Sequence, residues 1–359
     1  MRKKAVVAMS GGVDSSVAAA LLVDAGYDVT GIMLKLWKGA AANNDSGCCN
    51  LGAADDARRV ADVLEIPFYV LNFSDRFETT VIDDFHSEYA AGRTPNPCVR
   101  CNQWIKFDAL LKRTDVLGAD VLATGHYARV RRRDGRYKLL RGIDAAKDQS
   151  YVLWMLTQQE LARSLFPVGE MTKPETRAIA AELGLRTATK PDSQEICFVP
   201  DGDLDSYMAT ESAAGPIVDA TGSVVGEHNG LGRFTIGQRK GLGISLGVPV
   251  YVTAIDPAAN KVVVGSRAEL AVAGFRADEV SFVDGPVPDG TDVLVQHRAH
   301  GEVASATVAH RNGSVEVRFD QPVEAVAPGQ SAAFYSREDP DELLGGGIIG
   351  ATIPAGALV

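Results

Sequence analysis

Apolar and polar positions follow two different periods along the first 125 residues. Runs of consecutive apolar residues, which are typical of strands buried on both faces, occur at residues 3–9, 29–36, 68–73 and 120–124. Apolar residues between these runs recur every three or four positions, which predicts helices at 16–25, 53–64, 77–91 and 105–117. Because strands and helices alternate, we expect an α/β domain with a doubly wound parallel sheet and a site beyond the carboxyl ends of its strands.

The pattern changes further along the chain. Residues 149–182 keep helical spacing, which Pro167, Gly169 and Pro174 interrupt. After about residue 205 the helical signals fade into short, glycine-punctuated segments, and from 275 onward short alternating runs are separated by turn residues. We therefore predict a first domain at 1–205, a small central domain at 206–272 and a C-terminal β-barrel at 273–359.

The loop Ser10-Gly11-Gly12-Val13-Asp14-Ser15 joins the first predicted strand to the first predicted helix. Glycines let the backbone approach an anion closely, and the first amides of a helix point outward, so the loop predicts a phosphate site. An ordinary strand-to-helix turn is the alternative, because Gly-Gly and Asp-Ser pairs are common in turns. Neither Gly-x-x-x-x-Gly-Lys-Ser/Thr nor Gly-x-Gly-x-x-Gly is present here.

Two further features concern the same sheet edge. His126 follows the fourth strand, where a packing role and a functional role are equally plausible. The arginine-rich segment 128–148 contains Asp134-Gly135 between alternating residues, which predicts a hairpin. Such a hairpin is either a solvated edge or a contact for a phosphate backbone.

Composition narrows the class of protein. The chain has 46% hydrophobic and 23% charged residues, as soluble globular proteins do, and it lacks the roughly 18 consecutive apolar residues of a membrane helix. We expect a cytoplasmic protein that does not contact membranes. The net charge of −10 argues against non-specific nucleic-acid binding by the whole surface but allows a local basic patch.

The five cysteines do not form the pattern of a secreted disulfide framework. Cys98 and Cys101 form a Cys-x-x-Cys pair, which fits half of a zinc site, part of an iron–sulfur site or a redox pair. A four-cysteine zinc site is disfavoured, because the available second pair, Cys48-Cys49, has no intervening residues. We interpret Cys48 and Cys49 as structural.

Taken together, these motifs resemble one family over about residues 5–350: the tRNA-specific 2-thiouridylases of the ATP pyrophosphatase superfamily. The resemblance rests on the first loop and on segments 94–97, 101–102, 123–128, 147–151, 192–198, 235–243, 328–331 and 345–347. It implies that ATP, with Mg²⁺ on its phosphates, binds Ala8, Met9, Ser10, Gly11, Gly12, Val13, Asp14, Ser15, Leu34 and Gly125. It also implies that tRNA contacts Asn96, Pro97, Cys98, His126, Lys147, Asp148, Gln149, Arg298, Ala299 and Gln330.

The resemblance further implies a reaction. The C2 oxygen of the wobble uridine becomes adenylated by ATP, and AMP then leaves as a persulfide on Cys197 attacks that carbon. Cys101 is the partner thiol, which releases the sulfur and leaves a Cys101–Cys197 disulfide. The implied partners are tRNA and a sulfur-donor protein, such as a cysteine desulfurase or a sulfur-relay protein, and we expect a monomer.

One position departs from the family pattern. Cys98 stands where many members have an aspartate, so the role proposed for that carboxylate does not transfer unchanged. With three thiols in one site, an iron–sulfur cluster is a minority hypothesis. Rival functions are a ligase that adenylates a small substrate, an RNA-binding protein with a vestigial loop, and a thiolase acting on carbon 4 of uridine. ATP cleavage that depends on tRNA would separate the enzyme from the RNA-binding protein.

Overall fold

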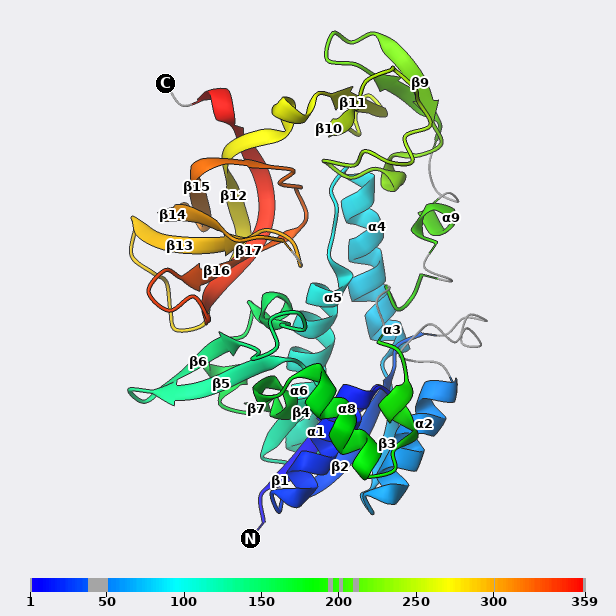
Figure 1. Ribbon diagram of the computed structural model, residues 1–359, viewed down its shortest axis with the longest axis vertical. Helices are drawn as coiled ribbons and strands as arrows, with labels where there is room; N and C mark the ends of the chain where they lie inside the picture. The colour runs from blue at the N-terminus through cyan, green and yellow to red at the C-terminus, as the bar shows by residue number, and fades with distance from the viewer. Residues whose placement is uncertain are drawn as a thin grey trace.

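The structure is a computed structural model that describes residues 2–37, 51–192, 196–199, 203–208, 213–299 and 301–357. It contains a parallel sheet with helices, a small central sheet and a closed antiparallel barrel, which confirms the predicted fold class. In Figure 1 the parallel sheet lies at the bottom, the central sheet at the top right and the barrel at the upper left. The exact boundaries predicted between the three domains stay predictions.

The first sheet has the strand order β3-β2-β1-β4-β7. Its strands are β1 (Lys4–Ala8), β2 (Asp28–Lys35), β3 (Phe68–Asn72), β4 (Val121–Thr124) and β7 (Ser164–Leu165), all parallel. β1 is central, and Ala8 is in register with Ile32 and Thr124, so three strand ends meet at one edge. β7 was not predicted, because this two-residue strand lies in a stretch with helical spacing.

Helices cover both faces of this sheet, and separate apolar cores form on the two sides. The principal helices of this part of the chain are α1 (Val13–Asp24), α2 (Leu51–Val63), α3 (Ser74–Phe77), η2 (Glu78–Ile82), α4 (Asp83–Ala90), α5 (Pro97–Arg100), η3 (Cys101–Leu110), α6 (Leu111–Val116), α7 (Gln158–Leu161) and α8 (Lys173–Glu182). Of these, α4 extends away from the parallel sheet toward the central sheet (Figure 1). The helix predicted at 105–117 begins earlier, at Pro97. The sequence pattern missed its cap: the Asn96 side chain accepts hydrogen bonds from the amides of Cys98 and Val99.

The arginine-rich segment forms a hairpin of β5 (Ala128–Arg133) and β6 (Arg136–Arg141). Asp134 and Gly135 both have positive φ, 50° and 80°, as a tight two-residue hairpin turn requires, so the predicted turn is confirmed. The hairpin does not protrude alone, because β6 pairs with β17 (Glu342–Pro354) and extends the barrel sheet. Its basic side chains form ion pairs: Arg129–Asp341, Arg131–Glu170, Arg133–Asp339, Arg136–Asp284, Lys138–Glu342 and Arg141–Asp148.

The central sheet has the order β10-β11-β8-β9, with β8 (Gly215–Val218), β9 (Val224–His228), β10 (Tyr251–Asp256) and β11 (Lys261–Gly265). The barrel strands before β17 are β12 (Ala271–Phe282), β13 (Thr291–Gln296), β14 (Ala304–Arg311), β15 (Ser314–Glu324) and β16 (Ser331–Ser336), and β12 pairs with β17 to close it. The remaining short helices are η4 (Ser150–Leu153), η5 (Pro167–Glu170), η6 (Arg186–Thr189), α9 (Leu204–Met208), η8 (Leu231–Arg233), η9 (Arg267–Leu270) and η10 (Ala355–Ala357). None of the helices in the described ranges is long and apolar enough to cross a membrane.

Candidate active site

The loop between β1 and α1 has the geometry expected of an anion site. Gly11 has φ of 71°, and a Cβ atom there would lie 2.2 Å from the carbonyl oxygen of Ala53, so only glycine fits. Inside the loop, the Ser10 amide donates to Ser15 Oγ at 3.1 Å, and Ser16 Oγ donates to the Gly12 carbonyl at 2.8 Å. None of the described side chains caps α1, which leaves its first turn to a ligand or to water.

Gly125, at the end of β4, packs directly against this loop. A Cβ atom on Gly125 would lie 2.6 Å from the Ser15 amide nitrogen and 2.8 Å from the Asp14 carbonyl carbon. The structure therefore brings the predicted loop and Gly125 together. Leu34 is buried at the end of β2, next to β1 in the sheet, and Met9 and Val13 are buried as well.

Three side chains that the sequence analysis did not predict hold the loop. Lys173, on the first turn of α8, places Nζ 2.8 and 2.9 Å from the two carboxylate oxygens of Asp14. The Tyr127 hydroxyl donates to the same carboxylate at 3.0 Å. Lys190 Nζ lies 3.0 Å from the Gly11 carbonyl oxygen and 2.8 Å from Asp56 Oδ2. No local sequence signal distinguishes these lysines from others, although Tyr127 lies in a segment that carried the family resemblance.

Asp192 links this cluster to the predicted tRNA segment. Its carboxylate accepts hydrogen bonds from Lys147 at 2.7 Å and Arg177 at 2.9 Å and pairs with Lys173 at 2.7 Å. Burial alone would raise the pKa of Asp192, but the hydrogen bonds and positive charges of Lys147 and Lys173 lower it to about 2. The carboxylate is therefore ionised throughout the physiological range.

The remaining residues of the predicted tRNA segment 147–149 make internal contacts. Asp148 accepts hydrogen bonds from Arg141 at 2.7 Å and from the Gly142 amide at 3.0 Å. Gln149 is exposed, and its side-chain oxygen accepts from the Tyr127 amide at 3.1 Å. These contacts hold residues 148 and 149 against neighbouring segments of the protein.

His126 is buried between aromatic rings. Its Nδ1 lies 2.6 Å from Thr124 Oγ1, and its ring centroid lies 6.1 Å from that of Phe107 and 6.0 Å from that of Phe166. Burial, with a smaller contribution from the charge of Lys106, holds the pKa of His126 well below its usual value. The imidazole is therefore neutral at neutral pH, and its placement favours the packing role.

Cys101 and Cys197 pack into the same apolar core. Cys101 is buried at the start of the π-helical segment η3, and Cys197 is partly buried against that core. Phe198, which follows Cys197, is buried and makes edge-on contacts with Phe77 and Phe85, with centroids 5.8 and 5.2 Å apart. The described part of the structure holds both cysteines as thiols, so it does not support the implied disulfide. Cys48 and Cys49, interpreted as structural, lie outside the described residues.

Barrel residues hold the segment that precedes Cys101 in the sequence. Gln330 donates to the Thr94 carbonyl at 2.9 Å, and the Thr94 amide donates to the Pro328 carbonyl at 2.8 Å. The Arg100 guanidinium donates to both carboxylate oxygens of Glu279 on β12, at 2.7 and 2.8 Å. Predicted tRNA residues Asn96, Pro97 and Cys98 lie between these anchors, with Cys98 exposed at the first turn of α5.

A cavity of about 740 Å³ lies between the hairpin and the barrel. Two predicted tRNA residues, Asp148 and Ala299, contribute to its lining, together with Arg129, Arg141 and Gln296. Gln296 donates to the Ala299 carbonyl at 2.9 Å, which fixes the loop that carries the exposed Arg298. This cavity brings residues from two predicted tRNA segments to one surface.

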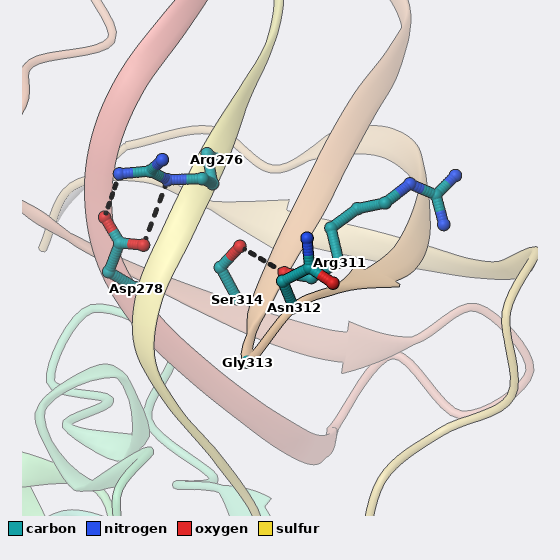
Figure 2. Close-up of a pocket in the computed structure, with 6 residues that line it drawn as sticks. All are labelled: Arg276, Asp278, Arg311, Asn312, Gly313 and Ser314. Atoms are coloured by element: carbon teal, nitrogen blue, oxygen red, sulfur yellow. Dashed lines mark hydrogen bonds and ion pairs between the residues drawn. The ribbon is translucent and has the colours of Figure 1, made fainter.

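A second cavity, of about 390 Å³, lies on the barrel (Figure 2). Figure 2 shows Arg276 paired with Asp278, whereas Arg311 points away from that pair. The lining contains none of the predicted site residues. We assign it no function.

A metal centre needs several metal-ligating side chains grouped in space. Within the described ranges, no three His, Cys, Asp or Glu side chains are grouped so that they could hold a metal ion. Cys98, Cys101 and Cys197 are therefore not grouped as a cluster site would require.

Comparisons with known proteins agree with this architecture. Residues 3–201 match the tRNA methyl transferase HUP domain family, residues 204–266 its PRC-barrel domain, and residues 272–349 the aminomethyltransferase beta-barrel domain. The fold and site therefore define a three-domain protein with an N-terminal HUP domain. The chain belongs to the tRNA-specific 2-thiouridylase family, which confirms the resemblance seen in the sequence.

Two full-length relatives document this membership. The tRNA-specific 2-thiouridylase MnmA of Geotalea uraniireducens is 50% identical over 97% of this chain and 95% of its own. The protein of the same name from Geobacter metallireducens is 48% identical over 99% of both chains. Among solved structures, a 4-thiouridine synthetase in complex with RNA and ATP is 18% identical, with a TM-score of 0.39 over 55% of this chain and 46% of that chain.

Proposed function

We propose that this protein transfers sulfur to carbon 2 of the wobble uridine of tRNA, using ATP to activate the C2 oxygen. The observation that carries the proposal is the pair Cys101 and Cys197, which come from distant parts of the sequence: Cys101 is buried in one apolar core and Cys197 packs against the same core. Membership in the 2-thiouridylase family supports the substrate class. One matching family model is described as a tRNA methyl transferase domain, but the relatives that are 50 and 48% identical to this chain are 2-thiouridylases, and the proposal follows these relatives.

The loop supports the use of ATP as the activating substrate. Gly11 permits close approach of phosphate oxygens, and the uncapped first turn of α1 supplies amide donors. Lys173 and Lys190 place positive charge beside the loop, where it would stabilise a departing pyrophosphate. In this proposal Asp14, whose carboxylate pairs with Lys173 here, would hold Mg²⁺ on the nucleotide phosphates.

The thiols of Cys101 and Cys197 carry out the sulfur transfer. In the proposed reaction the C2 oxygen attacks the α-phosphorus of ATP and pyrophosphate leaves, giving an O-adenylated uridine. The terminal sulfur of a Cys197 persulfide attacks carbon 2, and AMP leaves with the oxygen. The Cys101 thiolate attacks the Cys197 sulfur, so that the transferred sulfur stays on the base and a Cys101–Cys197 disulfide forms, which an external dithiol reduces.

The test is a reaction with ATP, Mg²⁺, unmodified tRNA, cysteine and a cysteine desulfurase, with AMP and the nucleoside masses as readouts. We expect 2-thiouridine at the wobble position, lost in Cys197→Ser and Cys101→Ser while AMP formation partly survives. Cys98 is an exposed thiol on the same helical segment as Cys101. The Cys98→Ser variant is expected to transfer sulfur more slowly but not to lose the activity. AMP formation without sulfur transfer, unchanged in either variant, would mean that the acceptor is a small molecule instead.

A further inference from the structure

Asp192 joins three parts of the molecule that the proposed function uses. Its carboxylate contacts Lys147, in the predicted tRNA segment, and Lys173, which holds Asp14 in the nucleotide loop. It also precedes Cys197 by five positions in the sequence. Asp192 has no role in the reaction described above.

The contacts form one continuous chain of charges. Lys147 Nζ lies 2.7 Å from Asp192 Oδ2, and Lys173 Nζ lies 2.7 Å from Asp192 Oδ1. The same Lys173 nitrogen lies 2.8 Å from Asp14 Oδ1. The Lys173 side chain is 9% exposed and the Asp192 side chain 22%, so solvent screens these pairs less than it screens a surface ion pair.

The two ends of the chain differ in exposure. The Lys147 side chain is 35% exposed and lies on the segment expected to meet the RNA, whereas the Lys173 side chain is enclosed. An RNA phosphate therefore reaches Lys147 first. When Lys147 turns to a phosphate, Asp192 Oδ2 loses its cation, and the carboxylate draws Lys173 more strongly. The ion pair between Asp14 and Lys173 then weakens, and the Asp14 carboxylate becomes available to a Mg²⁺-bound phosphate.

We propose that Asp192 is a positioning residue for the adenylation step. Asp192 and Asp14 both bind Lys173, so RNA bound at Lys147 changes the position of Lys173 at the nucleotide loop. The inference rests on the proposed function, because it requires both RNA and nucleotide to bind. It defines two states. Without RNA, Lys147 forms an ion pair with Asp192; with RNA bound, Lys147 forms an ion pair with an RNA phosphate. By linkage, the nucleotide must change RNA affinity by the same factor as RNA changes nucleotide affinity.

The experiment measures the equilibrium affinity of the full-length protein for Mg²⁺ and α,β-methylene-ATP, with and without saturating unmodified tRNA. In the wild type we expect tRNA to tighten nucleotide binding about tenfold, within the usual range of coupling between sites. Lys147→Met is expected to bind the nucleotide tightly without tRNA, with little further change when tRNA is added. Asp192→Asn is expected to lose the coupling, and Asp192→Glu to restore part of it.

Lys261→Met is the matched control, since Lys261 forms an ion pair with Asp256 at 3.4 Å in the central domain. It should keep the wild-type coupling. The inference is overturned if tRNA does not change nucleotide affinity in the wild type, or if Lys147→Met retains the full effect. The same preparations are assayed for 2-thiouridine: thiolation without coupling rejects this inference alone, whereas no thiolation by the wild type rejects the proposed function.

Discussion

Lys173 Nζ lies 2.8 Å from Asp14 Oδ1, although the two residues are 159 positions apart in the sequence. Asp14 lies on the first turn of α1, directly after the glycine-rich turn that follows β1, and Lys173 lies on the first turn of α8. The pair ties a helix from late in the first domain to the loop that we propose binds ATP. In the proposed reaction, this lysine would supply positive charge where negative charge develops as pyrophosphate leaves.

Replacing Lys173 should impair adenylation. In Lys173→Met we expect AMP formation to fall about a hundredfold, the usual cost of losing one preorganised charge in a transition state. Single-turnover AMP formation in the presence of tRNA measures this, and Lys173→Arg, which keeps the charge, should lose much less. If Lys173→Met stays within about twofold of the wild type, the lysine is only structural.

Gly11 should not tolerate a side chain. A Cβ atom there would meet the Ala53 backbone, so Gly11→Ala must displace the loop or α2, and we expect nucleotide binding to be lost. Gly118→Ala is the matched control, because Gly118 also has a positive φ, 65°, but open space around it. It should cost about 1 kcal/mol of stability and leave nucleotide affinity unchanged. Nucleotide titration of both variants measures the difference, and equal affinities would contradict the role of the loop.

Arg100 should matter more for stability than Glu279. The Arg100 side chain is 6% exposed, donates to Glu279 and Asp84, and lies 4.6 Å from the Trp104 ring centroid. Arg100→Met should lower the free energy of unfolding by about 2 kcal/mol and reduce sulfur transfer, because Cys101 follows directly. Glu279→Gln keeps a hydrogen-bond acceptor at a half-exposed position and should cost less than about 1 kcal/mol. Urea unfolding measures both; the reverse order would contradict the assignment.

His297 should make the protein less stable in mild acid. Both ring nitrogens are buried without a hydrogen-bond partner among the described residues, and burial, aided by the charge of Arg298, lowers the pKa to about 4. Between about pH 4 and 6.5 the unfolded chain binds a proton that the folded protein does not, so stability falls as the pH drops through this window. From pH 7 to 5 the loss should be about 2 kcal/mol.

His297→Phe isolates this effect, since phenylalanine does not titrate. We expect the difference in unfolding free energy between pH 7 and pH 5, measured in urea, to be smaller in His297→Phe than in the wild type by about that amount. An equal pH dependence in both proteins would show that His297 is protonated, or paired, in the folded state.

Local patterns in the sequence determined the elements and the loop. Consecutive apolar runs and helical spacing predicted the parallel sheet, because those periods reflect which faces are buried. Gly11 and Gly12 predicted the anion loop, and Asp134-Gly135 predicted the hairpin turn, because backbone sterics select such residues wherever they occur. The resemblance to the 2-thiouridylases also came from linear motifs, and the comparisons confirmed it.

The tertiary structure alone decided which charges meet. A lysine at position 173 looks locally like any other, and only packing of α8 beside α1 places it on Asp14. The hairpin is rich in arginine in the sequence, yet Arg129 and Arg133 form ion pairs with Asp341 and Asp339 of the barrel, beside which β6 pairs with β17. His126, ambiguous in the sequence, is enclosed by rings from distant segments. Ion pairs and burial depend on which distant segments come together, and a one-dimensional pattern does not encode that proximity locally.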